Sequence, residues 1–281
     1  MSPLTTSMPF DSETTRYRPI NAFWLAHLSK LAYPRLDDGP PDLNTIEKKL
    51  SELDPKFSEV KGFDTKSSQA VVIKHENYVV ASFRGTDEIG DWLDNLNVVA
   101  EPGPLGNVHR GFNGALMDIW PAMKSTIRHF KRTPDGSRDR PLWLTGHSLG
   151  GALATLAAAS LVESDEPFYG LYTYGCPRVG DRTFARFFNV EAKQRTFRFQ
   201  NNSDIITRVP SRVMGYSHIG SFVYINVDGE LSTDIGRWYR FLDTVKGVAS
   251  DIGDRGWDAI KDHRIDEYIE AIGNFGDRDP G

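Results

Sequence analysis

Cysteine is almost absent from this sequence of 281 residues, in which Cys176 is the only one. A lone cysteine excludes an intramolecular disulfide framework and a metal site built from several thiolates. Blocks of lysine and arginine are also missing, and the formal net charge is -5. Because nucleic-acid-binding proteins carry clustered positive charge, we expect no nucleic-acid partner.

Long apolar segments are missing too. The longest apolar run, residues 149–162, falls short of the about 20 residues that a transmembrane helix needs. Residues 1–18 carry neither the basic n-region nor the apolar h-region of a signal peptide. We therefore expect no transmembrane segment, and a protein that is either cytoplasmic or secreted with its signal peptide absent from this chain.

The composition that remains is typical of an ordinary globular protein, with 39% hydrophobic and 25% charged residues. Residues 1–18 are polar and rich in threonine and proline, which indicates a flexible N-terminal arm. No internal repeat, low-complexity tract or linker interrupts the remainder. We expect residues 19–281 to form a single domain.

Hydrophobic periodicity predicts an alternation of helices and strands along the chain. Helices are expected at 20–33, 43–53, 112–130, 149–162 and 181–191, and strands at 70–73, 78–83, 142–145, 171–174, 196–200 and 222–227. Asn44 is the expected N-cap of the second helix, with Glu47 three residues later. Such alternation predicts an α/β fold with a mostly parallel central sheet and helices on both faces.

The most informative stretch is Gly-His-Ser-Leu-Gly at residues 146–150, between a strand and a helix rich in alanine and leucine. This context is that of a nucleophile elbow, in which the serine lies on a sharp turn that exposes its hydroxyl. Glycine is needed at 146 and 150 because a side chain there would collide with a neighbouring strand or helix. The pattern predicts Ser148 as a catalytic nucleophile.

A serine nucleophile needs a histidine base. Only His218 and His263 follow Ser148 in the chain, which is the order that this kind of site uses. Functional groups in open α/β sheets gather outside the carboxyl ends of the strands. His218 precedes the strand at 222–227, whereas His263 follows it, so His263 is the expected base.

The base in turn needs an acid that orients it. Asp204 follows the strand at 196–200 after a three-residue loop and is the expected acid. Asp181 is the alternative, but its place at the start of a helix is explained by an N-cap role. Asp262 is adjacent to His263 in sequence and is poorly placed to reach the far ring nitrogen.

Two backbone N–H groups should stabilise the oxyanion of a reaction at Ser148. Leu149 supplies one at the start of the helix. Thr86 is the expected second donor, through its backbone N–H and its hydroxyl, because it ends the loop after the strand at 78–83. Arg84 in the same loop is expected to have a structural role.

Taken together, these segments resemble the class 3 (fungal-type) triacylglycerol lipase family of the α/β-hydrolase superfamily over roughly residues 20–270. The motifs that carry the resemblance are FRGT at 83–86, HRGF at 109–112, GHSLGG at 146–151, YTYGCPRVG at 172–180, NNSDII at 201–206 and DH-x4-Y at 262–268. The resemblance implies an α/β-hydrolase fold, a Ser148–Asp204–His263 triad, and Thr86 and Leu149 as oxyanion donors.

The same resemblance implies a carboxylic ester hydrolase that forms an acyl-enzyme, most simply a triacylglycerol lipase. The expected substrate is an acylglycerol or another ester at a lipid–water interface, with peripheral lipid contact and without a metal or another cofactor. A phospholipase A1 or a feruloyl-type esterase on the same scaffold is the alternative. An inactive hydrolase fold that serves as a binding module is the remote one, because all three triad positions are filled.

An amphipathic stretch follows Thr86 directly. Ile89, Trp92, Leu93 and Leu96 recur at helical spacing, and acidic residues and Asn95 fill positions between them. In the family such a segment is the lid over the acyl pocket, and the alternative is an ordinary surface helix. The chain departs from the family in a long insert at 231–262 and in the distance of Val209-Pro210 behind Asp204.

Overall fold

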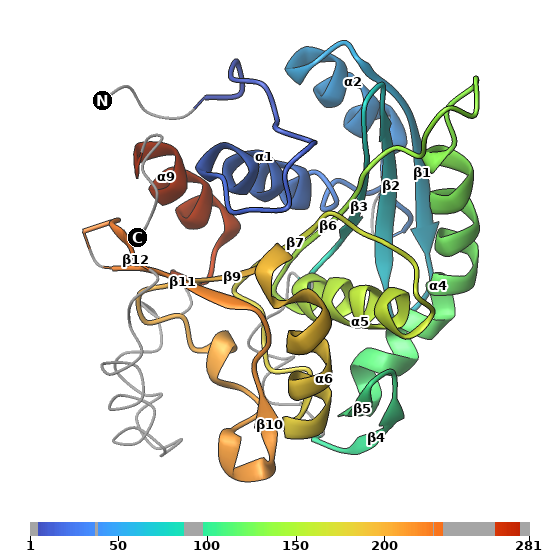
Figure 1. Ribbon diagram of the computed structural model, residues 1–281. Coiled ribbons are helices and arrows are strands. Elements are labelled where there is room, and N and C mark those ends of the chain that lie inside the picture. Colours follow the sequence, from blue (N-terminus) through green and yellow to red (C-terminus); the bar gives the residue numbers. More distant parts are fainter. Residues whose placement is uncertain (1–4, 37–38, 87–97, 227, 233–261, 276–281) are drawn as a thin grey trace.

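An eight-stranded sheet organises the molecule (Figure 1). The computed structural model describes residues 5–36, 39–86, 98–226, 228–232 and 262–275. In spatial order the strands are β1 (Phe57–Asp64), β2 (Gln69–His75), β3 (Val79–Phe83), β6 (Leu142–His147), β7 (Gly170–Tyr174), β9 (Thr196–Asn201), β11 (Ser221–Ile225) and β12 (Leu231–Ser232).

The middle of this sheet is parallel. Strands β3, β6, β7, β9 and β11 pair in parallel, while β1, β2 and β12 add antiparallel pairs at the two edges. Parallel strands place their carboxyl ends along one edge of the sheet, which is where functional groups of such folds converge. The mostly parallel central sheet predicted from the sequence is confirmed.

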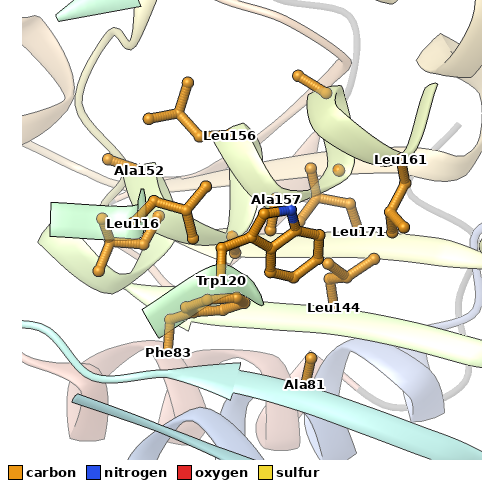
Figure 2. Close-up of a cluster of buried hydrophobic side chains, with 14 of the residues drawn as sticks. Ala81, Phe83, Leu116, Trp120, Leu144, Ala152, Leu156, Ala157, Leu161 and Leu171 are labelled. Atoms are coloured by element: carbon orange, nitrogen blue, oxygen red, sulfur yellow. The ribbon is translucent and has the colours of Figure 1, made fainter. Parts of the chain in front are cut away.

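Helices cover both faces of the sheet, as predicted, and each face has its own apolar core. One face carries α4 (Arg110–Lys131), α5 (Leu149–Glu163) and α6 (Arg182–Ala192), and the other carries α1 (Pro19–Lys30), α2 (Leu43–Leu53) and α9 (Ile265–Phe275). Figure 2 shows Trp120 of α4 beside Leu144 of β6, Leu171 of β7 and Ala157 of α5. None of the described helices is both long and apolar enough to cross a membrane.

A second, small antiparallel sheet was not predicted. Its strand order is β10 (Tyr216–Ser217), β8 (Gly180–Asp181), β5 (Gly106–His109) and β4 (Ala100–Gly103). Three short 3-10 helices lie nearby in the chain: η1 (Lys193–Arg195) between α6 and β9, and η2 (Ile206–Arg208) and η3 (Arg212–Met214) between β9 and β10. Strands of two to four residues are too short to produce a hydrophobic period. The small sheet therefore leaves no clear signal in the sequence.

One local prediction was wrong and one strand was not predicted. Asp42, not Asn44, caps α2, and its carboxylate accepts a hydrogen bond of 3.1 Å from the backbone N–H of Thr45. Strand β1 was missed because it lies at the sheet edge, where most of its side chains are exposed or half-buried. An edge strand of this kind lacks the apolar run that marks β2 and β3.

The N-terminal segment differs from the flexible arm expected for residues 1–18. From residue 5 onward it lies against the core. Trp24 of α1 donates from its indole N–H to the Met8 carbonyl at 2.7 Å. The Phe10 ring lies 4.9 Å from the Trp143 ring, and Tyr17 lies 5.3 Å from Phe197. These aromatic contacts hold a segment that its polar composition alone would leave loose.

Leu144→Ala is expected to lower the free energy of unfolding by about 2–5 kcal/mol, because Leu144 is fully buried in β6 and its truncation leaves a cavity. Urea unfolding followed by circular dichroism measures the loss. Met117→Ala on α4, where the side chain is 42% exposed, is the matched control and should change stability by no more than about 0.5 kcal/mol. Equal losses for both variants would contradict this placement of β6.

Candidate active site

Ser148 lies at the turn between β6 and α5, with φ 58° and ψ -129°. A positive φ is rare for residues other than glycine and is found at strained, functional turns. A Cβ at Gly146 would lie 2.3 Å from the Gly150 carbonyl oxygen, and one at Gly150 would lie 2.1 Å from the Phe83 oxygen. Both positions therefore require glycine, for the reason expected from the sequence.

The loop after β3 lies directly against this turn. A Cβ at Gly85 would be 2.7 Å from the His147 carbonyl oxygen and 3.1 Å from Ser148 Cβ. Thr86, the next residue, is half-buried, and Leu149, also half-buried, opens α5. The two expected oxyanion donors thus lie on the two segments that flank Ser148, and the N-terminus of α5 adds a favourable dipole for negative charge.

Arg84 occupies the same loop and points its guanidinium group toward structural partners. Its Nη1 donates to Gln69 Oε1 at 2.5 Å, and the guanidinium lies 5.6 Å from the centre of the Tyr33 ring. The backbone N–H of Arg84 also donates to the Gln69 carbonyl. These contacts agree with a structural role for Arg84.

His263 and Asp204 form a fully buried pair. His263 Nδ1 lies 2.8 Å from Asp204 Oδ2 and 2.9 Å from Oδ1. An ionised carboxylate only accepts hydrogen bonds, so Nδ1 carries the proton that it donates. In the neutral ring Nε2 then has a free lone pair, which is the arrangement that a general base requires.

Tyr268 of α9 completes the surroundings of this carboxylate. Its hydroxyl donates to Asp204 Oδ2 at 2.5 Å and accepts from the Asn201 backbone N–H at 3.0 Å. The Ile206 N–H donates to Asp204 Oδ1 at 2.9 Å. Burial alone would raise the pKa of Asp204, but His263 and Tyr268 together hold that pKa below its ordinary value.

Backbone contacts connect the candidate nucleophile to this pair. The Ser148 N–H donates to the Tyr174 carbonyl at 2.9 Å, at the carboxyl end of β7. The next residue, Gly175, has φ 59°, and a Cβ there would lie 2.7 Å from the His263 ring and 2.8 Å from Asp204 Oδ2. Gly175 is therefore the point at which the serine turn, the histidine and the aspartate meet.

Ser148 Oγ and His263 Nε2 are both buried, and neither has a hydrogen-bond partner among the residues that the structure describes. The hydroxyl can donate and the Nε2 lone pair can accept, so the two atoms are chemically complementary. Buried polar atoms without a partner are rare in folded proteins and need an explanation. Nucleophile–base hydrogen bonds are often long in a free enzyme and shorten when substrate binds.

His147, which precedes Ser148, links three parts of the site. Its Nε2 lies 2.5 Å from the His263 carbonyl oxygen and its Nδ1 lies 2.7 Å from the Tyr33 hydroxyl. Burial, together with the neighbouring His263, lowers the pKa of His147 to about 3, so its ring is neutral near pH 7. Since a carbonyl only accepts, Nε2 donates to His263, and Nδ1 accepts from Tyr33.

The alternatives weighed from the sequence lie elsewhere or act differently. His218 is at the amino end of β11, where its Nε2 donates to the Thr207 carbonyl at 2.7 Å. Asp181 caps α6 by accepting from the Phe184 N–H at 2.8 Å, as expected. Asp262 accepts from the Ser203 N–H at 3.1 Å, and so ties the loop before Asp204 to the segment that carries His263.

Sequence reasoning missed the roles of Tyr268, His147 and Tyr33. Tyr268 belongs to the last family motif, and this was its only signal, because its contact with Asp204 depends on how α9 packs. The lid candidates Ile89, Trp92, Leu93 and Leu96 lie outside the described residues. Residues 233–261, which make up most of the insert at 231–262, also lie outside the described residues.

Comparison with known proteins finds similarity to lipases and phospholipases. A family model described as Lipase (class 3) matches residues 80–214. The chain is 36% identical to secreted mono- and diacylglycerol lipase 1 of Fusarium solani, over 50% of this chain and 41% of the relative. It is 31% identical to phospholipase A1-II 4 of Oryza sativa subsp. japonica, over 63% of this chain and 52% of the relative. The chain thus spans about half the length of these curated relatives.

A solved triacylglycerol lipase whose catalytic centre is a serine protease triad matches with a TM-score of 0.59 and 26% identity, over 73% of this chain and 80% of that one. The parallel sheet, the helices on both faces and this likeness identify the fold as that of the α/β-hydrolases.

Tyr268→Phe is expected to lower the free energy of unfolding by about 1.5–3 kcal/mol near pH 7, because a charged, buried carboxylate loses a hydrogen bond. An aspartate whose pKa is lowered by folding stabilises the fold at pH values above its ordinary pKa of about 4. This stabilisation is lost as the pH falls through the folded-state pKa. The difference between wild type and variant should therefore shrink below about pH 4.

Urea unfolding at several pH values measures this difference. Tyr169→Phe is the control, because among the described residues the Tyr169 hydroxyl makes no hydrogen bond. A loss for Tyr268→Phe that is the same at every pH would show that the hydroxyl does not act through the Asp204 charge.

Proposed function

Because a class 3 lipase family model matches residues 80–214, we propose that this chain is a class 3 lipase and a serine carboxylic ester hydrolase that acts on acylglycerols. The observation that carries the proposal is that Ser148 Oγ and His263 Nε2 are both buried and have no hydrogen-bond partner among the described residues. The other ring nitrogen, His263 Nδ1, donates a hydrogen bond to Asp204. A hydroxyl donor and a ring acceptor in this state are the two halves of a nucleophile–base pair.

In the proposed reaction Ser148 Oγ attacks the ester carbonyl while His263 Nε2 accepts the hydroxyl proton. Asp204 holds the ring through Nδ1–H and stabilises the imidazolium that forms. The backbone N–H of Leu149 and the Thr86 donors stabilise the tetrahedral oxyanion. His263 then protonates the leaving alcohol, and water hydrolyses the acyl-serine by the same steps in reverse order.

Neutral His147 is a positioning residue in this proposal. It bonds to the backbone of His263 and is the residue next to Ser148, so it fixes the base and the nucleophile relative to each other. The Tyr33 hydroxyl also packs closely against the loop after β3, since a Cβ at Gly85 would lie 2.5 Å from it. Holding reacting groups in place is a major part of enzymatic acceleration.

A phospholipase A1 activity is the second candidate, because the chain is similar to a rice protein named phospholipase A1-II 4. Both activities share the chemistry at the ester and differ in the remainder of the substrate. A series of p-nitrophenyl esters and triglycerides of increasing chain length, compared with phosphatidylcholine, separates the two. Release of fatty acid from phosphatidylcholine in preference to triglyceride would favour the phospholipase.

Ser148→Ala is expected to abolish ester hydrolysis, with a loss in kcat on the order of 10⁵–10⁶, while the circular dichroism spectrum stays that of wild type. Tributyrin hydrolysis followed by titration measures the loss. Ser51→Ala, at an exposed serine on α2, is the control and should retain full activity. Activity of Ser148→Ala within tenfold of wild type would remove Ser148 from the mechanism.

His263→Ala and His218→Gln should behave in opposite ways. The first removes the proposed base and is expected to reduce kcat by a factor on the order of 10⁴ or more. The second keeps a side-chain donor near the Thr207 carbonyl, a contact that the proposed chemistry does not use, and should retain most of kcat per folded molecule. Stopped-flow kinetics on p-nitrophenyl butyrate, with folding checked by circular dichroism, decides between them, and the reverse pattern would make His218 the base.

A further inference from the structure

Exposed apolar side chains gather on two neighbouring elements, α6 and η3. Among the described residues six large hydrophobic side chains are exposed, and four of them lie here: Phe187, Val190, Val213 and Met214. Val213 is 95% exposed and Val190 is 76% exposed. Scattered exposed apolar residues need no explanation, but a group of them on adjoining elements marks an interaction site.

The two elements are held together by backbone pairing. Strand β8, which leads into α6, pairs antiparallel with β10, which follows η3, through Tyr216 with Asp181 and Ser217 with Gly180. Figure 1 shows α6 beside β10. Further along, Asn189 of α6 accepts from the Gly220 N–H at 2.7 Å. The helix and η3 therefore both lie against β10.

Arginine side chains surround these apolar residues. Arg182 and Arg186 are exposed on α6, and Arg212 is exposed at the start of η3. Among the described residues neither Arg182 nor Arg186 has an acidic partner, and the Arg186 guanidinium lies 5.0 Å from the Phe187 ring centre. Of the nearby acidic groups, Asp181 is engaged in capping α6 and Glu191 is exposed on the helix.

A hollow of about 300 Å³ lies between the two elements. Arg182 and Arg212 both line it, together with Tyr216, Ser217 and His218. The hollow is large enough for a phosphate-bearing headgroup, and arginine is well suited to bind phosphate and carboxylate oxygens. A positive surface on a chain whose net charge is -5 indicates a negatively charged partner.

We propose that α6 and η3 form a docking surface for an anionic lipid–water interface. The four apolar side chains enter the headgroup region, and the arginines pair with phosphate or carboxylate groups around them. The proposal rests on the ester hydrolase function above. Both elements are reached from the carboxyl edge of the sheet, η3 through the loop that begins at Asp204 and α6 through residues 175–181, so docking there brings this edge to the lipid.

A second copy of the chain fits this surface less well. In a two-fold dimer the same patch faces itself, so the arginines of one copy would lie against those of the other. Like charges at an interface oppose association, whereas an anionic lipid surface attracts all three arginines at once. Near such a surface each arginine is expected to strengthen binding about fivefold at moderate salt.

Vesicle flotation tests the proposal with the full chain carrying Ser148→Ala, so that the lipid stays intact. The vesicles are phosphatidylcholine alone, or phosphatidylcholine and phosphatidylglycerol in equal parts. We expect binding to the mixed vesicles that salt weakens. Val213→Ser/Met214→Ser should lower the partition coefficient at least tenfold, and Arg182→Gln/Arg186→Gln should reduce binding on mixed vesicles toward the level seen with phosphatidylcholine alone.

Two matched controls distinguish binding through this surface from nonspecific binding to the vesicles. Met117→Ser removes an exposed apolar side chain on α4, and Lys48→Gln/Lys49→Gln removes two exposed charges on α2. Neither should change the partition coefficient by more than twofold. Equal losses for the controls, or no loss for the α6 and η3 variants with thermal unfolding unchanged, would overturn the proposal.

A dimer detected by sedimentation and abolished by Val213→Ser/Met214→Ser would also overturn it, in favour of self-association. Hydrolysis of soluble p-nitrophenyl acetate by the wild type tests the ester hydrolase function separately. Because the flotation assay uses a protein without Ser148, failure of one proposal does not imply failure of the other.

Discussion

The close approach of three backbone segments around Ser148 is the constraint on which the remainder of the site depends. The ends of β3 and β7 and the start of α5 all contact the turn that carries this serine. Gly146, Gly150 and Gly175 leave no room for a Cβ, so these segments approach within van der Waals distance. A positive φ at Ser148 persists only because its neighbours over-determine it. The local cost is offset by the packing of the central strands β3, β6, β7 and β9, whose residues are all buried.

A buried carboxylate sets the second requirement. An ionised Asp204 without hydrogen-bond partners would strongly destabilise the fold, because the side chain is fully buried from solvent. Three donors surround it: His263 Nδ1, the Tyr268 hydroxyl and the Ile206 N–H. His263 and Tyr268 lie on the segment at 262–275, so the charge also holds α9 against the loop after β9, to which Asp204 and Ile206 belong. The interaction that lowers the pKa of Asp204 is thus the one that attaches the segment with His263 to the fold.

Chain order and strand ends were enough to predict which aspartate and histidine the fold brings together. Asp204 and His263 were chosen over Asp181 and His218 by the sheet edge each would reach, and the structure pairs Asp204 with His263. Contacts that depend on how elements pack could not be predicted. Tyr268 reaches Asp204 only through the orientation of α9. Likewise, the buried Arg178 side chain reaches the carbonyls of Arg208 and Pro210 only because two loops meet, and hydrophobic periodicity does not place loops. Propensity likewise placed the α2 cap at Asn44, two residues late.

Arg178 connects the proposed docking surface to the proposed chemistry. Its side chain is 1% exposed and donates to the carbonyls of Arg208 and Pro210, the latter at 2.9 Å. Its backbone N–H donates to the Val209 carbonyl at 2.7 Å. The segment that leads into α6 is therefore fastened to the segment that runs from Asp204 to η3. Because the buried Nη1 of Arg178 donates to two carbonyls of the segment after Asp204, the residues that lead into α6 and the backbone beside the acid are held to each other rather than packed independently.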